Sequence, residues 1–153
     1  MSWQTVLKQH LVDAGAAVTP PITTVRMSIA QSPVRQITCE YLGDEASPWG
    51  GNTLATRQVG EHFEIKAWLP VATFDQQPAE DLDSLLQAIK EQIVSRLEGD
   101  GQLGDATHVE RLETQDAKAG WEQWRNNDGT FGQIMRTITI PLVVGLNDVS
   151  VLA

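Results

Sequence analysis

Residues 81–97 (DLDSLLQAIKEQIVSRL) constrain the fold more than any other part of the chain, because their apolar side chains recur with a 3.6-residue period. The apolar positions are 82, 85, 86, 89, 93 and 97. This pattern predicts an amphipathic helix whose stripe must be buried against another layer. We expect the helix to span about residues 79–97, with Gly99 supplying the left-handed backbone that ends it.

The same glycine opens a literal G-x-G-x-x-G match, GDGQLG at residues 99–104. That pattern binds a dinucleotide when a strand runs into it and a helix leaves it, because the phosphates then meet the N–H groups of a helix N-terminus. Here a predicted helix precedes the glycines, and Glu98, Asp100 and Asp105 would repel a phosphate. We therefore interpret the segment as a helix-ending loop and expect no nucleotide cofactor.

Alternating runs provide the layer against which the helix can pack. Residues 35–41, 61–70 and 133–141 each predict a strand with one apolar face. The apolar positions of the first two are Ile37, Cys39 and Tyr41, and Phe63, Ile65, Ala67 and Leu69. The third run is rich in β-branched residues, and Pro141 indicates that its far end lies at a sheet edge or a bulge.

An N-terminal helix completes the predicted elements. Ser2 can cap a helix over about residues 3–14, and Gly15 is expected to end it. The order of helix, strands, helix and strands predicts an α+β fold: a mostly antiparallel sheet with two helices packed on one face. The length of 153 residues suits a single domain, residues 1–153.

Charge narrows the range of partners. The net charge is −9, of which residues 75–113 contribute −7 through ten acidic and three basic residues. Free nucleic acid is an unsuitable partner, because phosphate binding needs clustered Lys and Arg. We interpret the acidic segment as a solvated helix face. The alternative is that it forms a charged surface that contacts a basic neighbouring molecule. The start of the chain resembles an amphipathic helix and no apolar run reaches membrane-spanning length, so we expect no membrane partner.

Residues that carry catalytic or metal chemistry form no recognised pattern. The three histidines stand far apart without a second ligand at metal spacing, and no G-x-S-x-G motif occurs. His10 is expected to be a packed, hydrogen-bonded core residue on the stripe of the first helix. Cys39, the single cysteine, allows no internal disulfide and is expected to be a small core residue. We predict no enzyme activity and no catalytic, cofactor-binding or metal-binding residues.

Tryptophan outside the core pattern is the more informative feature. Trp68 lies on the polar face of its strand, and Trp49, Trp121 and Trp124 lie in turn-rich segments. Aromatic side chains in such positions are enriched at protein interfaces, so these four are candidate interface residues. The alternative is that each covers an edge of the core. Segments 43–52 and 120–132 are predicted to be turn-rich, and to be mobile until assembly orders them.

The order of these elements resembles that of a known family. The likeness runs through most of the chain and rests on its short N-terminal helix, the strand end CEYLGDE at 39–45, the strand end AWLP at 67–70, an acidic-started helix and a late alternating strand. This arrangement resembles the tail terminator proteins of long-tailed bacteriophages, lambda's among them. The resemblance implies a hexameric ring that caps the finished tail tube, stops its polymerisation and prepares the surface for head joining.

The same resemblance implies where the protein works and with what. Its partners would be further copies of itself, the tail tube protein and a head-neck protein. It would be located in the virion tail after assembly in the bacterial cytoplasm. Two alternatives stay open on the residues: a small α+β enzyme or ligand-binding domain, and another phage neck, tube or baseplate component.

Overall fold

The computed structural model describes residues 2–46, 56–71 and 79–150. Its elements are α1 (Trp3–Ala16), β1 (Val25–Arg26), β2 (Gln36–Ala46), β3 (Thr56–Pro70), α2 (Ala79–Asp100), β4 (Val109–Thr114), β5 (Lys118–Arg125) and β6 (Phe131–Ser150). The predicted α+β class is confirmed. The two expected helices and the three expected strands are all present, and each extends beyond its predicted range.

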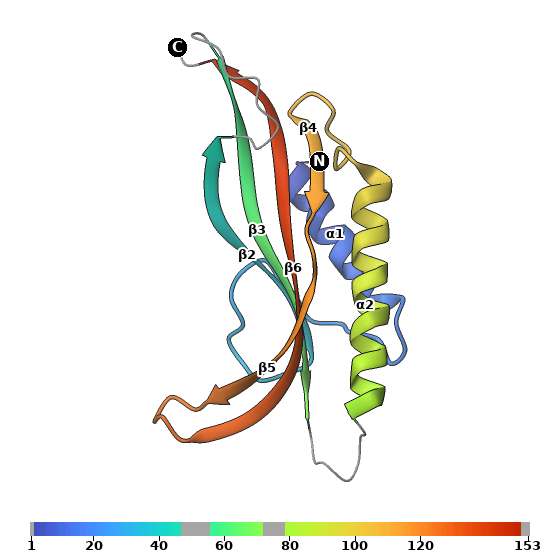
Figure 1. Ribbon diagram of the computed structural model, residues 1–153, viewed down its shortest axis with the longest axis vertical. Coiled ribbons are helices and arrows are strands. Elements are labelled where there is room, and N and C mark those ends of the chain that lie inside the picture. Colours follow the sequence, from blue (N-terminus) through green and yellow to red (C-terminus); the bar gives the residue numbers. More distant parts are fainter. Residues whose placement is uncertain (1, 47–55, 72–78, 151–153) are drawn as a thin grey trace.

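The two helices lie side by side on one face of the sheet (Figure 1). The strand order is β1-β2-β3-β6-β4, and β5 also pairs with β6. The short β1–β2 pair is parallel and the other described pairs are antiparallel. This arrangement is the mostly antiparallel sheet that the sequence predicts.

Helix α2 buries its whole predicted stripe, and α1 buries most of its apolar face. Every apolar position of the α2 stripe is buried, from Leu82 to Leu97, and α1 buries Trp3, Leu7 and Leu11. Their partners on the sheet include Ile37, Ile65 and Ile140, each fully or almost fully buried. Ser2 caps α1 as expected, because its Oγ accepts the N–H of Thr5 at 3.3 Å.

The positions of the helix-ending glycines were predicted wrongly. Gly99 lies inside α2, and the left-handed residue is Gly101 (φ 67°), whose N–H donates to the carbonyl of Leu97 at 3.0 Å. Gly15 likewise lies inside α1. It is needed there for close packing, because a Cβ at this position would come within 2.5 Å of the carbonyl oxygen of Ile22.

The expected loop at 43–52 was partly wrong as well. Residues 43–46 continue β2, with a register shift between Tyr41 and Gly43 that leaves Leu42 unpaired. Gly43 has a φ of 112°, which glycine adopts at little cost. The rest of that segment, including Trp49, lies outside the described residues.

Pro141 does not mark a strand end. It lies in the middle of β6, opposite Glu64 of β3. On its other flank, β4 ends opposite Leu142 and β5 begins opposite Thr139, so Pro141 falls at the break between them. The carbonyl oxygen of Pro141 accepts the N–H of Gln115 at 2.8 Å, on the side of this break. In an antiparallel strand the N and the carbonyl of one residue point to the same side, so the N–H that proline lacks would also have pointed into the break. The proline is tolerated because no ladder hydrogen bond is required there.

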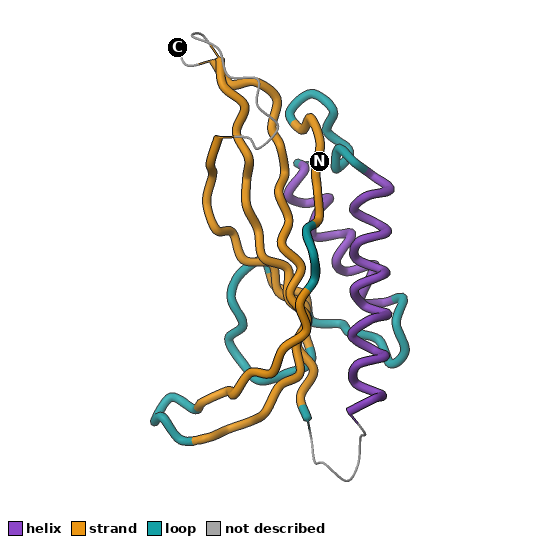
Figure 2. The backbone as a smooth tube through the Cα atoms, viewed as in Figure 1, coloured by secondary structure: helices purple, strands orange, loops and turns teal. Residues whose placement is uncertain are grey.

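Segment 120–132 was predicted to be turn-rich, and this was wrong for most of its length. Residues up to Arg125 belong to β5, which forms a hairpin with the first part of β6. The irregular part is limited to residues 126–130, which join the two strands. Residues 145–150 likewise belong to β6, which pairs there with β3. Figure 2 shows the hairpin curving away from the two helices as an arm.

Candidate interaction surfaces

The β5–β6 hairpin presents an aromatic surface that is anchored to the body of the protein. Trp121 is 52% exposed, and the guanidinium of Arg136 lies 4.7 Å from its ring centroid. Arg136 also donates from Nε to a carboxylate oxygen of Asp83 on α2 at 2.8 Å and from Nη1 to the carbonyl of Gly120 at 2.8 Å. The arginine therefore supports one face of the exposed indole while linking the hairpin to α2.

Beside this indole the hairpin surface is hollowed. Trp121, Glu122, Gln123 and Ile134 line a depression of about 430 Å³. The indole and Ile134 make part of its wall apolar, which is the kind of surface that a protein partner can desolvate.

Trp68 and Trp124 line the same pocket on the face of the sheet opposite the helices. This pocket is small, about 200 Å³, and is also lined by residues of β2, β3 and the segment before β2. Trp68 is only 9% exposed, and its Nε1 donates to Thr38 Oγ1 at 2.9 Å. The ammonium of Lys66 lies 4.4 Å from the Trp68 ring centroid and pairs with Glu122 of the hairpin. These contacts hold Trp68 within the protomer and tie the hairpin to β3.

The four candidate tryptophans therefore do not form one surface. Trp121 and Trp124 are three residues apart on β5 and so point to opposite faces. Trp121 is the exposed candidate, Trp124 is half-buried and Trp68 is buried. Trp49 lies outside the described residues. The interface role of these residues stays a prediction, and the surface properties favour Trp121.

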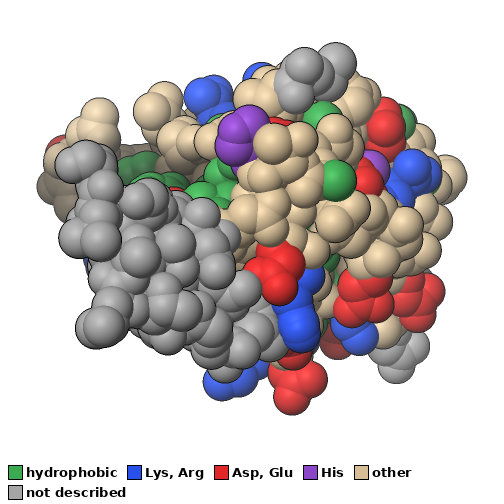
Figure 3. All heavy atoms as spheres, turned by 90° about the horizontal axis from the view of Figure 1, so that it is seen from above, with side chains coloured by type: hydrophobic (Ala, Val, Ile, Leu, Met, Phe, Trp, Pro, Cys, Tyr) green, Lys and Arg blue, Asp and Glu red, His purple; other side chains and the backbone are tan. Residues whose placement is uncertain are grey.

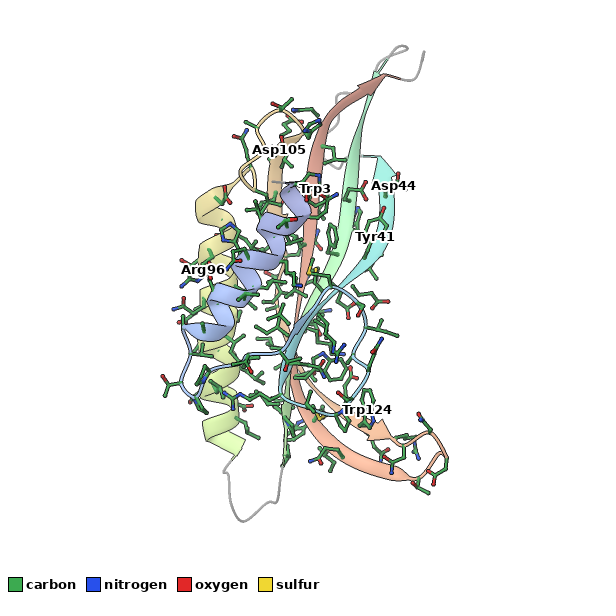
Figure 4. All side chains as sticks on the ribbon, turned by 180° about the vertical axis from the view of Figure 1, so that it is seen from behind. Trp3, Tyr41, Asp44, Arg96, Asp105 and Trp124 are labelled. Atoms are coloured by element: carbon green, nitrogen blue, oxygen red, sulfur yellow. The ribbon has the colours of Figure 1, made fainter. Side chains whose placement is uncertain are left out.

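A cleft that the sequence did not predict lies between the start of α1 and strands β2 and β3. Its volume is about 680 Å³, and its lining includes Trp3, Lys8, Tyr41, Glu61 and Phe63. The Phe63 ring lies 5.9 Å from that of Trp3 and 5.4 Å from that of Tyr41, between ring centroids. Figure 4 shows Trp3 on α1 and Tyr41 and Asp44 on β2 at the same end of the molecule.

Tyr41 gives this cleft an exposed aromatic rim. Its alternation with Ile37 and Cys39 placed it on the core face, but its side chain is 53% exposed. A side-chain hydrogen bond to Glu61 raises its pKa to about 12, with partial burial and the negative charges of Glu61 and Asp44 acting in the same direction. The rim of the cleft is therefore both aromatic and locally negative.

The acidic segment uses several of its carboxylates inside the protomer. Asp83 pairs with Arg136, and Asp105 accepts from Nδ1 of His108. Asp100 binds Nε2 of His10 at 2.6 Å through one carboxylate oxygen and accepts the N–H of Gly104 at 3.3 Å through the other. Residues 101–104 of the G-x-G-x-x-G match thus form a loop that follows a helix, as the sequence order indicated, and Asp100 at the end of α2 ties this region to α1.

Acidic and basic side chains lie interspersed on the surface seen in Figure 3, which views the molecule end-on. Among the described residues, no group of three or more His, Cys, Asp or Glu side chains could hold a metal ion. Within the same residues, neither helix is long and apolar enough to cross a membrane. His10 is hydrogen-bonded as expected, although it is half-buried at the α1 surface and outside the core.

Cys39 is a buried core residue, as predicted, and burial raises the pKa of its thiol to about 12. We expect native protein to react very slowly with a thiol reagent near neutral pH and to react quickly once unfolded. The raised pKa also destabilises the fold in alkali: between pH 9 and about 12 the unfolded chain ionises its thiol while the folded chain does not. Urea unfolding across this pH range, with Cys39→Ala as control, measures the effect. Rapid labelling of the native protein would contradict the prediction.

Comparison with known proteins identifies the fold. No family model matches the sequence, and no curated protein matches it either. A chain in a solved structure of the virion of a native gene transfer agent particle is similar, with a TM-score of 0.51 and 15% sequence identity. The match covers 94% of this chain and 92% of that chain. The two chains therefore share a fold over most of their length.

Proposed function

We propose that this chain is a structural protein of a phage-like virion, and that it acts as the tail terminator. In this role it forms a ring, hexameric by resemblance to the terminator family, which caps the tail tube and ends its polymerisation. The observation that carries the proposal is the fold shared over nearly the full length of both chains with a virion component. The order of sequence elements that resembles tail terminators adds the specific role.

The surfaces of the protomer suit assembly better than catalysis. A closed ring needs a heterologous interface, in which one patch meets a different patch on the neighbouring copy. The protomer has two distinct aromatic surfaces, the one around Trp121 and the cleft beside Trp3. Its remaining partners would be the tail tube protein and a head-neck protein, and the protein would reach the virion tail after assembly in the cytoplasm.

The acidic segment contributes charge to this assembly. Exposed ion pairs are weak, about 0 to 1 kcal/mol each, so aromatic contacts supply most of the affinity and charges mainly set register and salt sensitivity. The carboxylates of Asp83, Asp100 and Asp105 already have partners within the protomer. Other acids of the segment, such as Glu91 and Glu113, are exposed at the surface, where a neighbouring molecule can sense their field.

Sedimentation of the purified protein at low and high salt, alone and with purified tail tubes, tests the proposal. We expect ring-sized particles, and electron microscopy should find them at tube ends. Tube preparations capped by the ring should no longer extend when tube protein is added. Binding along the tube or to a baseplate would instead favour another tail component. A protein that stays monomeric in every condition and never binds tubes would leave the enzyme or ligand-binding alternative.

A further inference from the structure

We propose that the cleft between α1, β2 and β3 receives the β5–β6 hairpin of a second copy of the chain. The inference rests on the proposed function, because it identifies the two surfaces that meet when copies assemble. It specifies a heterologous contact: the hairpin surface around Trp121 and Arg125 on one copy, and the cleft around Trp3, Tyr41 and Glu61 on the next.

The cleft has the properties of a receptor for an aromatic, cationic element. Trp3, Phe63 and Tyr41 supply aromatic walls, and the volume of about 680 Å³ lies within the range of pockets that hold a large ligand group. Two carboxylates, Glu61 and Asp44, lie close enough to Tyr41 to raise its pKa. Lys8 also lines the cleft, but the two carboxylates outnumber it, so a cation brought to the rim at Tyr41 would meet net negative charge and aromatic faces together.

The hairpin carries the complementary groups. Trp121 exposes about half of its surface, beside the apolar side chain of Ile134. Arg125 is exposed near the end of the hairpin, and its guanidinium donates to two neutral acceptors, the carbonyl of Gly129 at 3.3 Å and Gln123 Oε1 at 3.2 Å. Its positive charge is therefore available for a carboxylate on another molecule.

The two surfaces lie too far apart to meet within one copy. Trp121 pairs with Arg136 of β6, whereas Glu61 pairs with Val144 of the same strand. These positions of β6 are eight residues apart, which corresponds to about 26 Å along a strand that rises about 3.3 Å per residue. The hairpin also curves away from α1, the helix that borders the cleft (Figure 1). The contact is therefore between copies.

Charge reversal tests this pairing. We expect Arg125→Glu and Glu61→Arg each to weaken self-association at least about tenfold, because each brings like charges together. The double variant should regain most of the lost affinity, because it restores opposite charges in reversed order. Lys90→Glu and Glu91→Arg on α2 make the same charge changes away from both surfaces, so each should weaken self-association much less than the reversals at Arg125 and Glu61. Circular dichroism and thermal unfolding establish that each variant is folded.

Cross-linking provides an independent readout. Gln4 lines the cleft and Gln123 lies on the hairpin, and both are exposed. The Gln4→Cys and Gln123→Cys proteins both also carry Cys39→Ala, because Cys39 lines the cleft too. A mixture of the two proteins should then form a disulfide between the two variants on mild oxidation. A mixture of Gln102→Cys and Gln123→Cys is the control and should give far less product.

The outcomes separate this inference from the proposed function. If the parent protein assembles but the reversals leave association unchanged, or the double variant regains nothing, the hairpin–cleft contact is wrong while the terminator role stands. Absence of the Gln4–Gln123 cross-link in assembled protein would likewise overturn the contact. If the parent never self-associates, with or without tubes, both proposals fail.

Discussion

Replacing Ile89 by alanine is expected to lower the free energy of unfolding by about 2 to 5 kcal/mol. Ile89 lies at the middle of the α2 stripe and is fully buried within the core shared with α1 and the sheet. Truncation removes apolar contacts and leaves a cavity, because the helix is held on both sides of the position by Leu86 and Ile93. The surrounding side chains can therefore collapse only partly into the space.

Urea unfolding at equilibrium measures this loss. Ile29→Ala is the matched control, because it removes the same atoms from a side chain that is 59% exposed. The control should change the free energy of unfolding by no more than about 0.5 kcal/mol. Equal losses in the two variants would show that the α2 stripe is not the main source of stability.

Replacing Trp121 by alanine is expected to weaken self-association by about 2 kcal/mol or more, which corresponds to about thirtyfold in the dissociation constant. Tryptophan is enriched among the residues that dominate interface energies, and this indole is exposed while Arg136 holds one of its faces. The free protomer should keep its fold, because Trp121 lies on the arm and outside the core cluster.

Sedimentation equilibrium gives the dissociation constants, and thermal unfolding of the dissociated protomer gives the stability. Val12→Ala, which truncates an exposed apolar residue on α1, should leave assembly unchanged. Trp121→Phe should retain part of the affinity, since it keeps an aromatic ring. Two results would contradict the prediction: normal assembly of the alanine variant, or a fall in stability as large as that of Ile89→Ala.

The layers of the fold could be predicted because their signals are local and long. The α2 stripe repeats over more than four turns, and the residues around Ile65 and Ile138 alternate between apolar and polar. Burial of one face is the physical requirement behind both patterns, so pattern and structure agree. The same reasoning identified Cys39 as buried and the G-x-G-x-x-G segment as a loop that follows a helix.

The hairpin and the helix ends could not be predicted in this way, because their signals depend on distant partners. β5 has one glycine, four polar residues and no β-branched residue, and it forms a strand because β6 offers it a free flank over residues 131–139, before Pro141. Gly15 is required by the nearby carbonyl of Ile22 and not by a helix end. Residues far apart in sequence determine each of these features.

The candidate surfaces followed from the sequence only in part. Exposure of Trp121 agrees with its position outside the core pattern, but Trp68 has its indole N–H and one face engaged by its own protomer. The cleft was missed because Trp3 and Tyr41 belong to segments that predict buried faces. The negative charge at the rim of the cleft depends on Glu61 of β3 lying beside Tyr41 of β2. The sequence alone does not show that these two strands pair.

The continuity of β6 has a consequence for the thermodynamics of assembly. The arm and the body share this one strand, whose pairing with β3 and β5 fixes it in both regions. Ordering a flexible segment on binding costs about 1 to 2 kcal/mol per residue in backbone entropy, and folding has already ordered the strands of this arm. A preorganised arm loses less conformational entropy on binding, so a larger part of its contact energy contributes to the binding affinity. Under the proposed hairpin–cleft contact, the direction in which β6 carries the arm would set the angle between neighbouring copies, and with it the number of copies that closes a ring.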